Sequence, residues 1–372
     1  MIKSKFIKQC AILSVAATTC FTGNAFSANA AEKTPVIFDT DMAIDDWSAL
    51  LLLAKTDSID LLAVTANGVG ETRCAPAMRN IPALLALATE DEVVIGCGDA
   101  YPLDGYFTFP EPWRQQADTL SGVEIADGTL PITAKHPVHI IHEAIESTQQ
   151  KITLLATGSL TNIAQWIEHH PEDVSKVEKL VIMGGSFDTH GNIIVPGFTD
   201  GHPNKSAEWN IYVDAIAAEK VFSSQLNIEV VGLDVTNEVK VTTEFAKDFK
   251  KKAKTEAAIF WDKVLDDNDW FINSGEYYFW DVLAALVVID PSFCSGEYSS
   301  VTVSYDLIEQ PSQWDNQNIP DVTYTGAKRK SYDPATFGVL RRGGDNKPAK
   351  ICKKTKSKEA FSLFTETMNK SL

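Results

Sequence analysis

Residues 36–50 read Val36-Ile37-Phe38-Asp39-Thr40-Asp41-Met42-Ala43-Ile44-Asp45-Asp46-Trp47-Ser48-Ala49-Leu50. The apolar run 36–38 predicts a buried strand, and the apolar run 47–53 predicts a helix. Four aspartates therefore occupy a strand-to-helix turn. In an open α/β sheet such a turn lies at the carboxyl edge of the strands, where ligands bind.

The four carboxylates of this turn must repel one another. Two like charges about 4 Å apart repel by roughly 4 kcal/mol at an effective dielectric constant of 20. The acids can splay apart, with Asp45 or Asp46 capping the helix. Alternatively, a hard cation can bind among their oxygens. A cap needs one acid and this turn has four, so we favour the cation.

The rest of the chain alternates between strand-like and helix-like segments. The predicted strands are 61–64, 93–95, 152–156, 180–183 and 228–233, and the predicted helices are 75–88, 138–147, 160–169 and 215–222. This rhythm predicts one α/β domain over residues 32–372, with a mostly parallel sheet flanked by helices on both faces. Three later segments predict a solvated amphipathic helix (240–254), an antiparallel strand pair near the sheet edge (299–325) and a closing helix (360–368).

The first 31 residues have the features of a secretory signal peptide. Lys3, Lys5 and Lys8 precede an apolar run, 11–21, and a small-residue cleavage site, 27–31. The apolar run is too short to span a bilayer. We therefore expect cleavage near Ala31 and export to the periplasm or beyond.

The charge of the chain limits its partners. Removing three lysines from a chain of net charge −17 leaves −20. Such a surface does not suit nucleic acid or an anionic membrane. A small neutral or cationic substrate, or a bound cation, fits better.

Four cysteines remain after cleavage: Cys74, Cys97, Cys294 and Cys352. In an oxidising compartment one or two disulfides can form, and the sequence does not choose among the three full pairings. The wide spacing argues against a zinc site. We expect buried free thiols or one structural disulfide.

Polar clusters follow four other predicted elements. They are 67–71, 157–162, 183–185 (with 191–192 and 208–210), and 280–281. Each is weak alone, because a glycine after a strand usually marks a turn and Asp281 alone is more often a helix cap. Since the carboxyl ends of parallel strands share one edge, however, the clusters can meet there.

Together these residues resemble the inosine–uridine nucleoside hydrolase family. The match begins with the Asp-x-Asp-x-x-x-Asp-Asp turn at Asp39 and continues in order through further motifs, Ala156-Thr157-Gly158-x-Leu160-Thr161-Asn162, Met183-Gly184-Gly185, Glu208-x-Asn210, Gly232-Leu233-Asp234-x-Thr236 and Asp281. The similarity covers residues 36–291. It implies hydrolysis of the N-glycosidic bond of ribonucleosides to a free base and ribose, through an oxocarbenium-like transition state.

The resemblance also implies roles for single residues. Calcium would be held by three carboxylates and one backbone carbonyl, those of Asp41, Asp46, Asp281 and Thr157. Asp41 would act as general base on a metal-bound water. Ribose hydroxyls would be bound by Asp45, Asn192, Glu208 and Asn210, and Asp39 would lie just outside the ion's ligands.

The sequence departs from the best-known branch of the family near the nucleobase. Trp280 stands where that branch has histidine, and Glu71 stands where it has asparagine. Trp280 resembles the purine-preferring branch, in which indoles sandwich the base, and Trp113 is a candidate second indole. Core packing is the alternative for both. Glu71 would bind the 5′-hydroxyl or influence the leaving group, and His190 and His202 are weak candidates for a general acid, since loop histidines usually face solvent.

Two other functions fit the opening motif. A magnesium-dependent phosphohydrolase of the haloacid-dehalogenase kind also begins with strand-Asp-x-Asp, but its motif wants threonine or valine where this chain has Ala43. A non-catalytic nucleoside- or ribose-binding exported protein is the other alternative. Family members often form homo-oligomers, but the sequence does not indicate which surface would form the interface.

Overall fold

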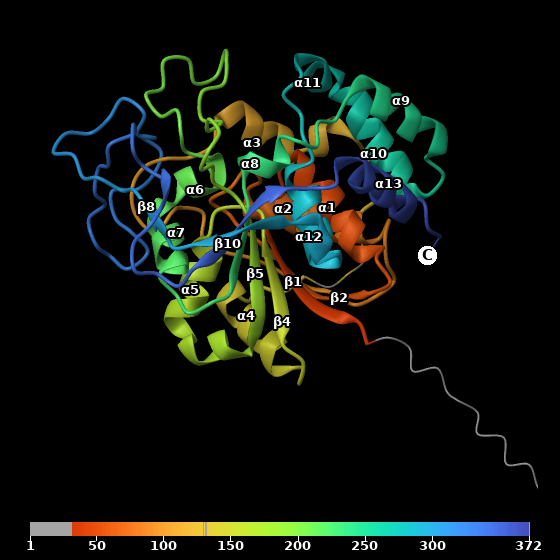
Figure 1. Ribbon diagram of the computed structural model, residues 1–372, viewed down its shortest axis with the longest axis horizontal. Coiled ribbons are helices and arrows are strands. Elements are labelled where there is room, and N and C mark those ends of the chain that lie inside the picture. The colour runs from red at the N-terminus through yellow and green to blue at the C-terminus, as the bar shows by residue number, and fades with distance from the viewer. Residues whose placement is uncertain (1–31, 129, 131, 372) are drawn as a thin grey trace, which may run out of the picture. The chain divides into compact units, whose positions relative to one another are not determined.

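The central sheet has eight strands in the order β3-β2-β1-β4-β5-β6-β10-β7 (Figure 1). Their bounds are β3 (Val94–Cys97), β2 (Ile59–Ala66), β1 (Thr34–Thr40), β4 (Ile152–Ala156), β5 (Val177–Met183), β6 (Ile228–Val231), β10 (Ala349–Lys354) and β7 (Ser295–Ser299). All neighbouring pairs are parallel except β10 with β7. The predicted mostly parallel α/β sheet is therefore confirmed.

The computed structural model describes residues 32–128, 130 and 132–371. The predicted signal peptide lies outside these residues and stays a prediction. Residues 33–372 form one compact unit. Within the described residues, no helix is both long and apolar enough to cross a membrane.

Helices cover both faces of the sheet, because successive residues of a strand point to opposite sides. Val36 and Phe38 of β1 face one core, and Ile37 between them faces the other. The first core is closed by α1 (Ile44–Ala54), α2 (Cys74–Leu85), α10 (Glu256–Asp267), α12 (Trp280–Ile289) and α13 (Ser357–Met368). The second is closed by α4 (Pro137–Glu146), α5 (Thr161–His169), α6 (Trp209–Val213) and α7 (Ala215–Phe222).

The strand order reverses at β1, which lies between β2 and β4. Asp39 of β1 is level with Thr65 of β2 and Ala156 of β4. The segments that follow these three strands therefore leave the sheet at the same height. This reversal point is where open α/β sheets form their binding crevice.

The remaining elements are short or lie outside the sheet. They are α3 (Glu111–Asp118), α8 (Leu233–Thr236), α9 (Thr243–Lys252), α11 (Asp269–Ser274), and the 3-10 turns η1 (Leu120–Gly122), η2 (Pro171–Lys176) and η3 (Pro291–Phe293). In α9 one residue, Phe249, is buried, which confirms the solvated amphipathic helix. Helix α13 confirms the closing helix.

The prediction that two strands within 299–325 pair with each other is wrong. Strand β7 pairs with β10, and β8 (Val301–Val303) pairs with β9 (Leu340–Arg342). Both partners come from the C-terminal part of the chain. Between β8 and β9 the chain forms loops with isolated bridges, so the strand after 299 finds its partner across a long sequence separation.

The cysteines form two disulfides, Cys74–Cys97 and Cys294–Cys352. The expectation of free thiols or a single disulfide is therefore wrong. The first bond joins the start of α2 to the end of β3, and the second joins the residue directly before β7 to strand β10. Tertiary structure decides these pairings, because both join segments that become neighbours only in the folded sheet.

Candidate active site

The turn after β1 has an unusual backbone at Met42, whose φ of 58° lies in the left-handed region. A residue other than glycine adopts this conformation only where its surroundings fix it. The Met42 carbonyl oxygen accepts hydrogen bonds from the Trp47 indole N–H and the Thr72 hydroxyl, both at 2.7 Å. These two bonds hold the turn, and with it the aspartates on either side.

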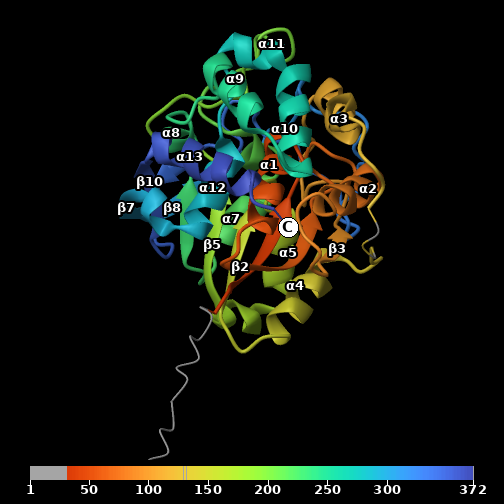
Figure 2. The same ribbon diagram turned by 90° about the vertical axis from the view of Figure 1, so that its right-hand side faces the viewer.

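Three carboxyl groups converge beside this turn. One oxygen from each of Asp45, Asp46 and Asp281 lies within 4.8 Å of the other two, and all three residues are buried. Asp45 and Asp46 are in the first turn of α1, and Asp281 is in the first turn of α12. These two helices lie side by side in both views (Figures 1 and 2). The opening acids and the late aspartate therefore meet, as predicted.

Asp46 lies at the centre of the cluster's hydrogen bonds. Its Oδ1 accepts from the hydroxyls of Thr40 and Thr157, the latter at 2.6 Å, and its Oδ2 accepts from the Ala43 N–H at 3.0 Å. Asp46 thus caps α1 from inside the helix, while Ala43 occupies the cap position. Capping employs one of the four acids, so it does not account for the whole cluster.

Asp41 is fixed from two sides by glycines. A Cβ built on Gly70 would lie 2.0 Å from the Asp41 Cβ, and one on Gly158 would lie 2.7 Å from it. The carboxylate accepts from the Ala43 N–H at 3.2 Å and from the Glu71 N–H at 3.4 Å. These contacts orient Asp41 toward Asp46, whose carboxyl group lies next to it.

Asp39 lies in strand β1, before the turn, and is not one of the three converging carboxyl groups. Its Oδ1 accepts from the Thr65 hydroxyl at 2.5 Å and from the Asn162 amide at 2.7 Å. Its Oδ2 is buried and has no hydrogen bond within the described part of the chain. Burial raises the pKa of Asp39 to about 7, against the lowering effect of these two donors.

Burial raises the pKa of every acid in the cluster, and for all of them except Asp46 the charge of a neighbouring carboxylate raises it further. Burial, followed by the charge of Asp46, raises the pKa of Asp45 to about 7. Burial and neighbouring carboxylates hold the pKa of Asp41 and of Asp281 well above the ordinary range. Burial and the charges of Asp45 and Asp46 raise the pKa of Glu71 to about 8. A bound cation would relieve this repulsion and keep the carboxyl groups ionised.

The geometry suits a hard divalent cation. Calcium binds oxygen ligands at about 2.4 Å, so two oxygens on opposite sides of one ion are about 4.8 Å apart. The separations among Asp45, Asp46 and Asp281 do not exceed this value. In this structure Asp45 belongs to the converging group, whereas the sequence resemblance placed Asp41 there. Asp41 touches the group through Asp46.

Glu208 and Asn210 lie beside the same edge of the sheet. Glu208 caps α6, and its carboxylate accepts from the N–H groups of Gly185, Asn210 and Ile211 at 2.9, 2.9 and 3.3 Å. The Asn210 side-chain amide donates to the Thr157 carbonyl at 3.1 Å and to the Met183 carbonyl at 3.2 Å. Asn210 therefore ties the ends of β4 and β5 together and orients the carbonyl predicted to bind the ion.

Asn192 reaches this region from the segment after β5. Its side-chain oxygen accepts from the Trp209 backbone N–H at 3.1 Å, and its carbonyl accepts from the Trp209 indole at 3.0 Å. Trp209 lies between Glu208 and Asn210. Three of the four residues predicted to bind ribose, Asn192, Glu208 and Asn210, are thus held in one hydrogen-bonded segment, whereas the fourth, Asp45, lies in α1.

The two candidate indoles belong to different aromatic groups. Trp113 lies in α3 and packs against Trp209 and Phe198, with ring centroids 5.4 Å apart in both pairs. Trp280 begins α12, directly before Asp281, and packs against Tyr278 at 5.5 Å. Its indole N–H is buried and has no hydrogen bond among the described residues. Both indoles are only partly buried.

Sequence reasoning missed Tyr277. Its hydroxyl is buried and makes no hydrogen bond within the described residues. Burial and the charges of Asp45 and Asp281 raise its pKa well above the ordinary range, so the hydroxyl lies within electrostatic range of both carboxyl groups. The sequence held one signal, the aromatic segment 270–280. It did not show which ring faces the acids.

The two histidines considered as general acids have different surroundings. His190 is exposed. His202 is buried, with its Nε2 2.9 Å from the Tyr212 hydroxyl and its Nδ1 accepting from the Asn204 N–H at 3.1 Å. The expectation that loop histidines face solvent is wrong for His202, which is a packed hydrogen-bonding residue.

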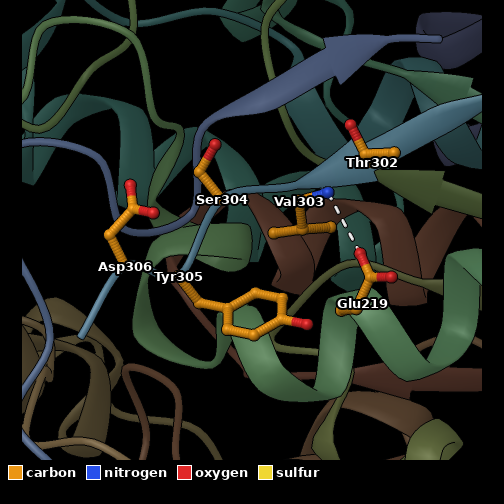
Figure 3. A pocket seen from close by; sticks show the side chains of 6 residues that line it. All are labelled: Glu219, Thr302, Val303, Ser304, Tyr305 and Asp306. Carbon is orange, nitrogen blue, oxygen red and sulfur yellow. Dashed lines mark hydrogen bonds between the residues drawn. The ribbon is translucent and has the colours of Figure 1, made fainter. Parts of the chain in front are cut away.

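Two surface pockets lie outside the aspartate cluster. One, of about 380 Å³, is formed by Glu219 of α7 and residues 302–306. In Figure 3 the Glu219 carboxylate points to the Val303 N–H, which donates to it at 3.1 Å. The other, of about 340 Å³, is lined in part by Arg114, which donates to the Gly68 carbonyl at 3.0 Å. This second pocket borders the segment that carries Glu71.

A family model described as inosine-uridine preferring nucleoside hydrolase matches residues 36–359. The chain belongs to this family. The resemblance seen in the motifs is thereby confirmed at the level of the family. This assignment replaces the two alternative functions considered from the sequence, a phosphohydrolase and a non-catalytic binding protein.

Individual nucleoside hydrolases agree with the assignment. Uridine nucleosidase 1 of Arabidopsis thaliana is 29% identical over 301 residues, 78% of this chain and 86% of the relative. A pyrimidine-specific ribonucleoside hydrolase of Escherichia coli O127:H6 is 29% identical over 222 residues, 58% of this chain and 65% of that protein.

Solved structures show the same fold. An inosine-uridine preferring nucleoside hydrolase from Bacillus anthracis has a TM-score of 0.73 at 23% identity, covering 91% of this chain and 100% of that chain. A purine-preferring ribonucleoside hydrolase from Gardnerella vaginalis has a TM-score of 0.68 at 21% identity, covering 90% and 98%. Membership of the family, which the family model shows, makes this chain an enzyme that cleaves the N-glycosidic bond of ribonucleosides. The similar proteins include enzymes of both base preferences.

Proposed function

We propose that this nucleoside hydrolase is calcium-dependent and favours purine nucleosides, which it cleaves to free base and ribose. The observation that carries the calcium requirement is the buried convergence of Asp45, Asp46 and Asp281. Ionised carboxyl groups so close together in a buried site need a compensating charge. Oxygen donors alone are the ligands that calcium prefers.

We assign the calcium ligands to the carboxylates of Asp41, Asp46 and Asp281 and to the Thr157 carbonyl. The Asp45 carboxylate, which lies within the converging group, is placed to accept from a ribose hydroxyl at the ion. When bound, calcium would orient the ribose hydroxyls and lower the pKa of a water molecule. The hydrogen bond from Asn210 leaves the second lone pair of the Thr157 carbonyl available.

The reaction develops positive charge on the ribose as the glycosidic bond breaks. Carboxylates fixed around the sugar stabilise this charge more than they stabilise the neutral ground state, which lowers the barrier. A carboxylate oxygen of Asp41 would take the proton of the attacking water. Asn192, Glu208 and Asn210 would orient the sugar, with Glu71 near the 5′-hydroxyl or the leaving base.

Trp280 supports the purine preference. Trp280 directly precedes Asp281 in the chain, and its indole packs against the rings of Phe271, Tyr277 and Tyr278. A two-ring purine offers more stacking area to such a wall than a pyrimidine does. Trp113 would supply a second indole from α3. Stacking on both faces would spread the charge on the departing purine.

Pyrimidine preference is the second candidate. It is favoured by the uridine- and pyrimidine-acting relatives named above. The two candidates predict opposite orders of kcat/KM for inosine and uridine.

The test is the release of free base from a panel of nucleosides, with the mature protein in calcium or in a chelator. We expect inosine to be cleaved faster than uridine, and all activity to disappear in the chelator and return with calcium. Undiminished turnover in chelator would exclude the calcium mechanism. A higher kcat/KM for uridine would replace the purine preference with the pyrimidine preference.

Export remains part of the proposal. Two disulfides are typical of proteins from oxidising compartments, which agrees with a cleaved signal peptide. The mass of the protein isolated from the exported fraction should correspond to a chain that begins near Ala31 or Glu32. A full-length chain retained in the cytoplasm would contradict it. The homo-oligomer suggested by the family stays a prediction for sedimentation analysis.

A further inference from the structure

A second group of metal-ligating side chains lies at the opposite edge of the sheet. His142 belongs to α4, which ends shortly before β4 begins, and His170, Glu172 and Asp173 lie at the turn η2, which directly precedes β5. The group is therefore at the amino edge of the strands. Helices α4 and α5 lie at this end of β4 and β5 in Figure 1. The aspartate cluster, in contrast, follows the carboxyl end of β1.

Four donor atoms converge in this histidine–carboxylate group. One nitrogen each from His142 and His170 and one oxygen each from Glu172 and Asp173 lie within 4.8 Å of one another. The His142 Nδ1 is 2.7 Å from the Asp173 Oδ2, and the His170 Nδ1 is 3.4 Å from the Glu172 Oε1. The two imidazoles stack with centroids 4.0 Å apart and planes 11° apart.

The electrostatics of the group suit a metal ion. The two imidazoles stack with their ring nitrogens beside the carboxylates of Asp173 and Glu172, and an imidazole nitrogen is a common metal ligand. The Asp173 side chain is fully buried, and the Lys176 ammonium, 3.1 Å from its Oδ1, is the cation that now balances it. A divalent ion among the four donors would take over this role.

The donor set selects the kind of ion. Two imidazole nitrogens with two carboxylate oxygens form a four-coordinate set typical of zinc, whereas calcium takes oxygen ligands alone. In a tetrahedral site with bonds of about 2.1 Å the donors are about 3.4 Å apart. The present separations therefore need adjustments of about an ångström, which the partly exposed His142 and His170 and the exposed Glu172 can make.

We propose that His142, His170, Glu172 and Asp173 form a site for zinc or a similar borderline divalent metal, separate from the catalytic calcium site. The bound ion joins helix α4 to the turn that leads into β5. His139, one turn before His142 on α4 and 6.3 Å from the His170 ring, remains outside the four ligands.

The first test is a zinc titration of the mature protein in excess calcium at pH 7.5, read by competition with a chromophoric chelator. Wild type is compared with the double variant His142→Gln/His170→Gln and with His190→Gln, which changes an exposed histidine elsewhere. We expect wild type and the control to bind one more zinc per chain than the double variant. Equal zinc uptake by wild type and the double variant would overturn the proposal.

The second test uses the competing lysine. In Lys176→Met the ammonium no longer occupies Asp173, so we expect zinc to bind several-fold more tightly than in wild type. Unchanged or weaker affinity would show that Asp173 is not a ligand. If the double variant misfolds, the single variant His170→Gln, at a partly exposed position, replaces it in the comparison. Circular dichroism shows whether each variant is folded. Zinc should raise the melting temperature of wild type but not of His170→Gln, and an equal rise in both would also overturn the site.

Discussion

Asp46 and Asp281 are far apart in the sequence, yet their carboxyl oxygens lie within 4.8 Å of each other. Each stands in the first turn of its own helix, where the helix dipole favours negative charge. The favourable dipoles reduce the repulsion between the two buried acids but do not remove it. The repulsion between the two carboxylates therefore raises the free energy of the calcium-free protein, and a bound cation can relieve it.

Replacing Asp281 by asparagine should separate activity from stability. We expect Asp281→Asn to lower kcat/KM for inosine by about 100-fold or more, since it removes a fixed charge from the reacting sugar and the ion. In chelator we expect the same variant to be more stable than wild type by about 1 kcal/mol, because one repelling charge is gone. Asp269→Asn, at an exposed acid in the first turn of α11, should leave the activity unchanged and should not raise the stability, because it loses only a favourable interaction with the helix dipole. Urea unfolding and steady-state kinetics measure both effects, and a destabilised calcium-free Asp281→Asn would contradict the account.

Tyr277→Phe tests whether the buried hydroxyl serves the substrate. The hydroxyl has no hydrogen bond within the described residues, so its removal should leave the free energy of unfolding unchanged or slightly higher. Among the described residues the buried hydroxyl is unpaired, and it lies within electrostatic range of Asp45 and Asp281, so we expect it to donate to bound ribose or its water and kcat/KM to fall by about tenfold on its removal, the equivalent of one hydrogen bond. Tyr298→Phe, at an exposed tyrosine, is the control. Full activity in Tyr277→Phe would leave its hydroxyl without a functional role.

Gly70 should tolerate no side chain. The added Cβ in Gly70→Ala would lie 2.0 Å from the Asp41 Cβ, so Asp41 must move and kcat/KM should fall by at least about tenfold. The matched control is Gly326→Ala, because Gly326 has a φ of 84° but nothing within 4 Å of the added Cβ. That variant should lose about 1 kcal/mol of stability from backbone strain and keep its activity. Similar kinetics for the two variants would show that Asp41 is not positioned by this contact.

His202 should make the protein sensitive to acid. Its Nδ1 accepts from the Asn204 N–H, so its Nε2 carries the proton donated to Tyr212, and the neutral ring is the form that fits. Burial lowers the pKa of His202 from 6.5 to about 4. Between these values the unfolded chain binds more protons than the folded one, so stability falls as pH falls from 6.5 to 4. The urea midpoint of wild type should drop more over this range than that of His202→Gln. His190→Gln should keep the wild-type slope, and an equal slope in all three proteins would exclude His202 as the cause.

Much of the fold was predictable because it depends on local patterns. The strand 152–156 follows from an apolar run of β length, and the α/β alternation sets the parallel sheet. The pairing of β7 with β10 was not predictable, because the sequence of a short strand does not indicate which distant segment will form hydrogen bonds with it. The disulfide Cys294–Cys352 depends on this same pairing.

The candidate site shows the same division. The acids at Asp41, Asp45 and Asp46 could be named from their density in one turn, and Asp281 from its place in a familiar order of motifs. The hydrogen bonds of Glu208 to three backbone amides could not, since they depend on where the ends of β5 and α6 meet. The sequence does not distinguish Tyr277 from the five other aromatic residues of 270–280. Its burial within range of the charges of Asp45 and Asp281 is visible only in the folded structure.

The sequence by itself determined the kind of chemistry, because carboxylates at the ends of apolar strands already specify oxygen ligands at one edge of a parallel sheet. Tertiary structure decided which of them converge. The packing of α12 beside α1 brings Asp281 to Asp45 and Asp46, and the backbone of Met42 turns Asp41 beside them. Distances of a few ångströms between residues far apart in the chain depend on helix packing, and no local pattern encodes them.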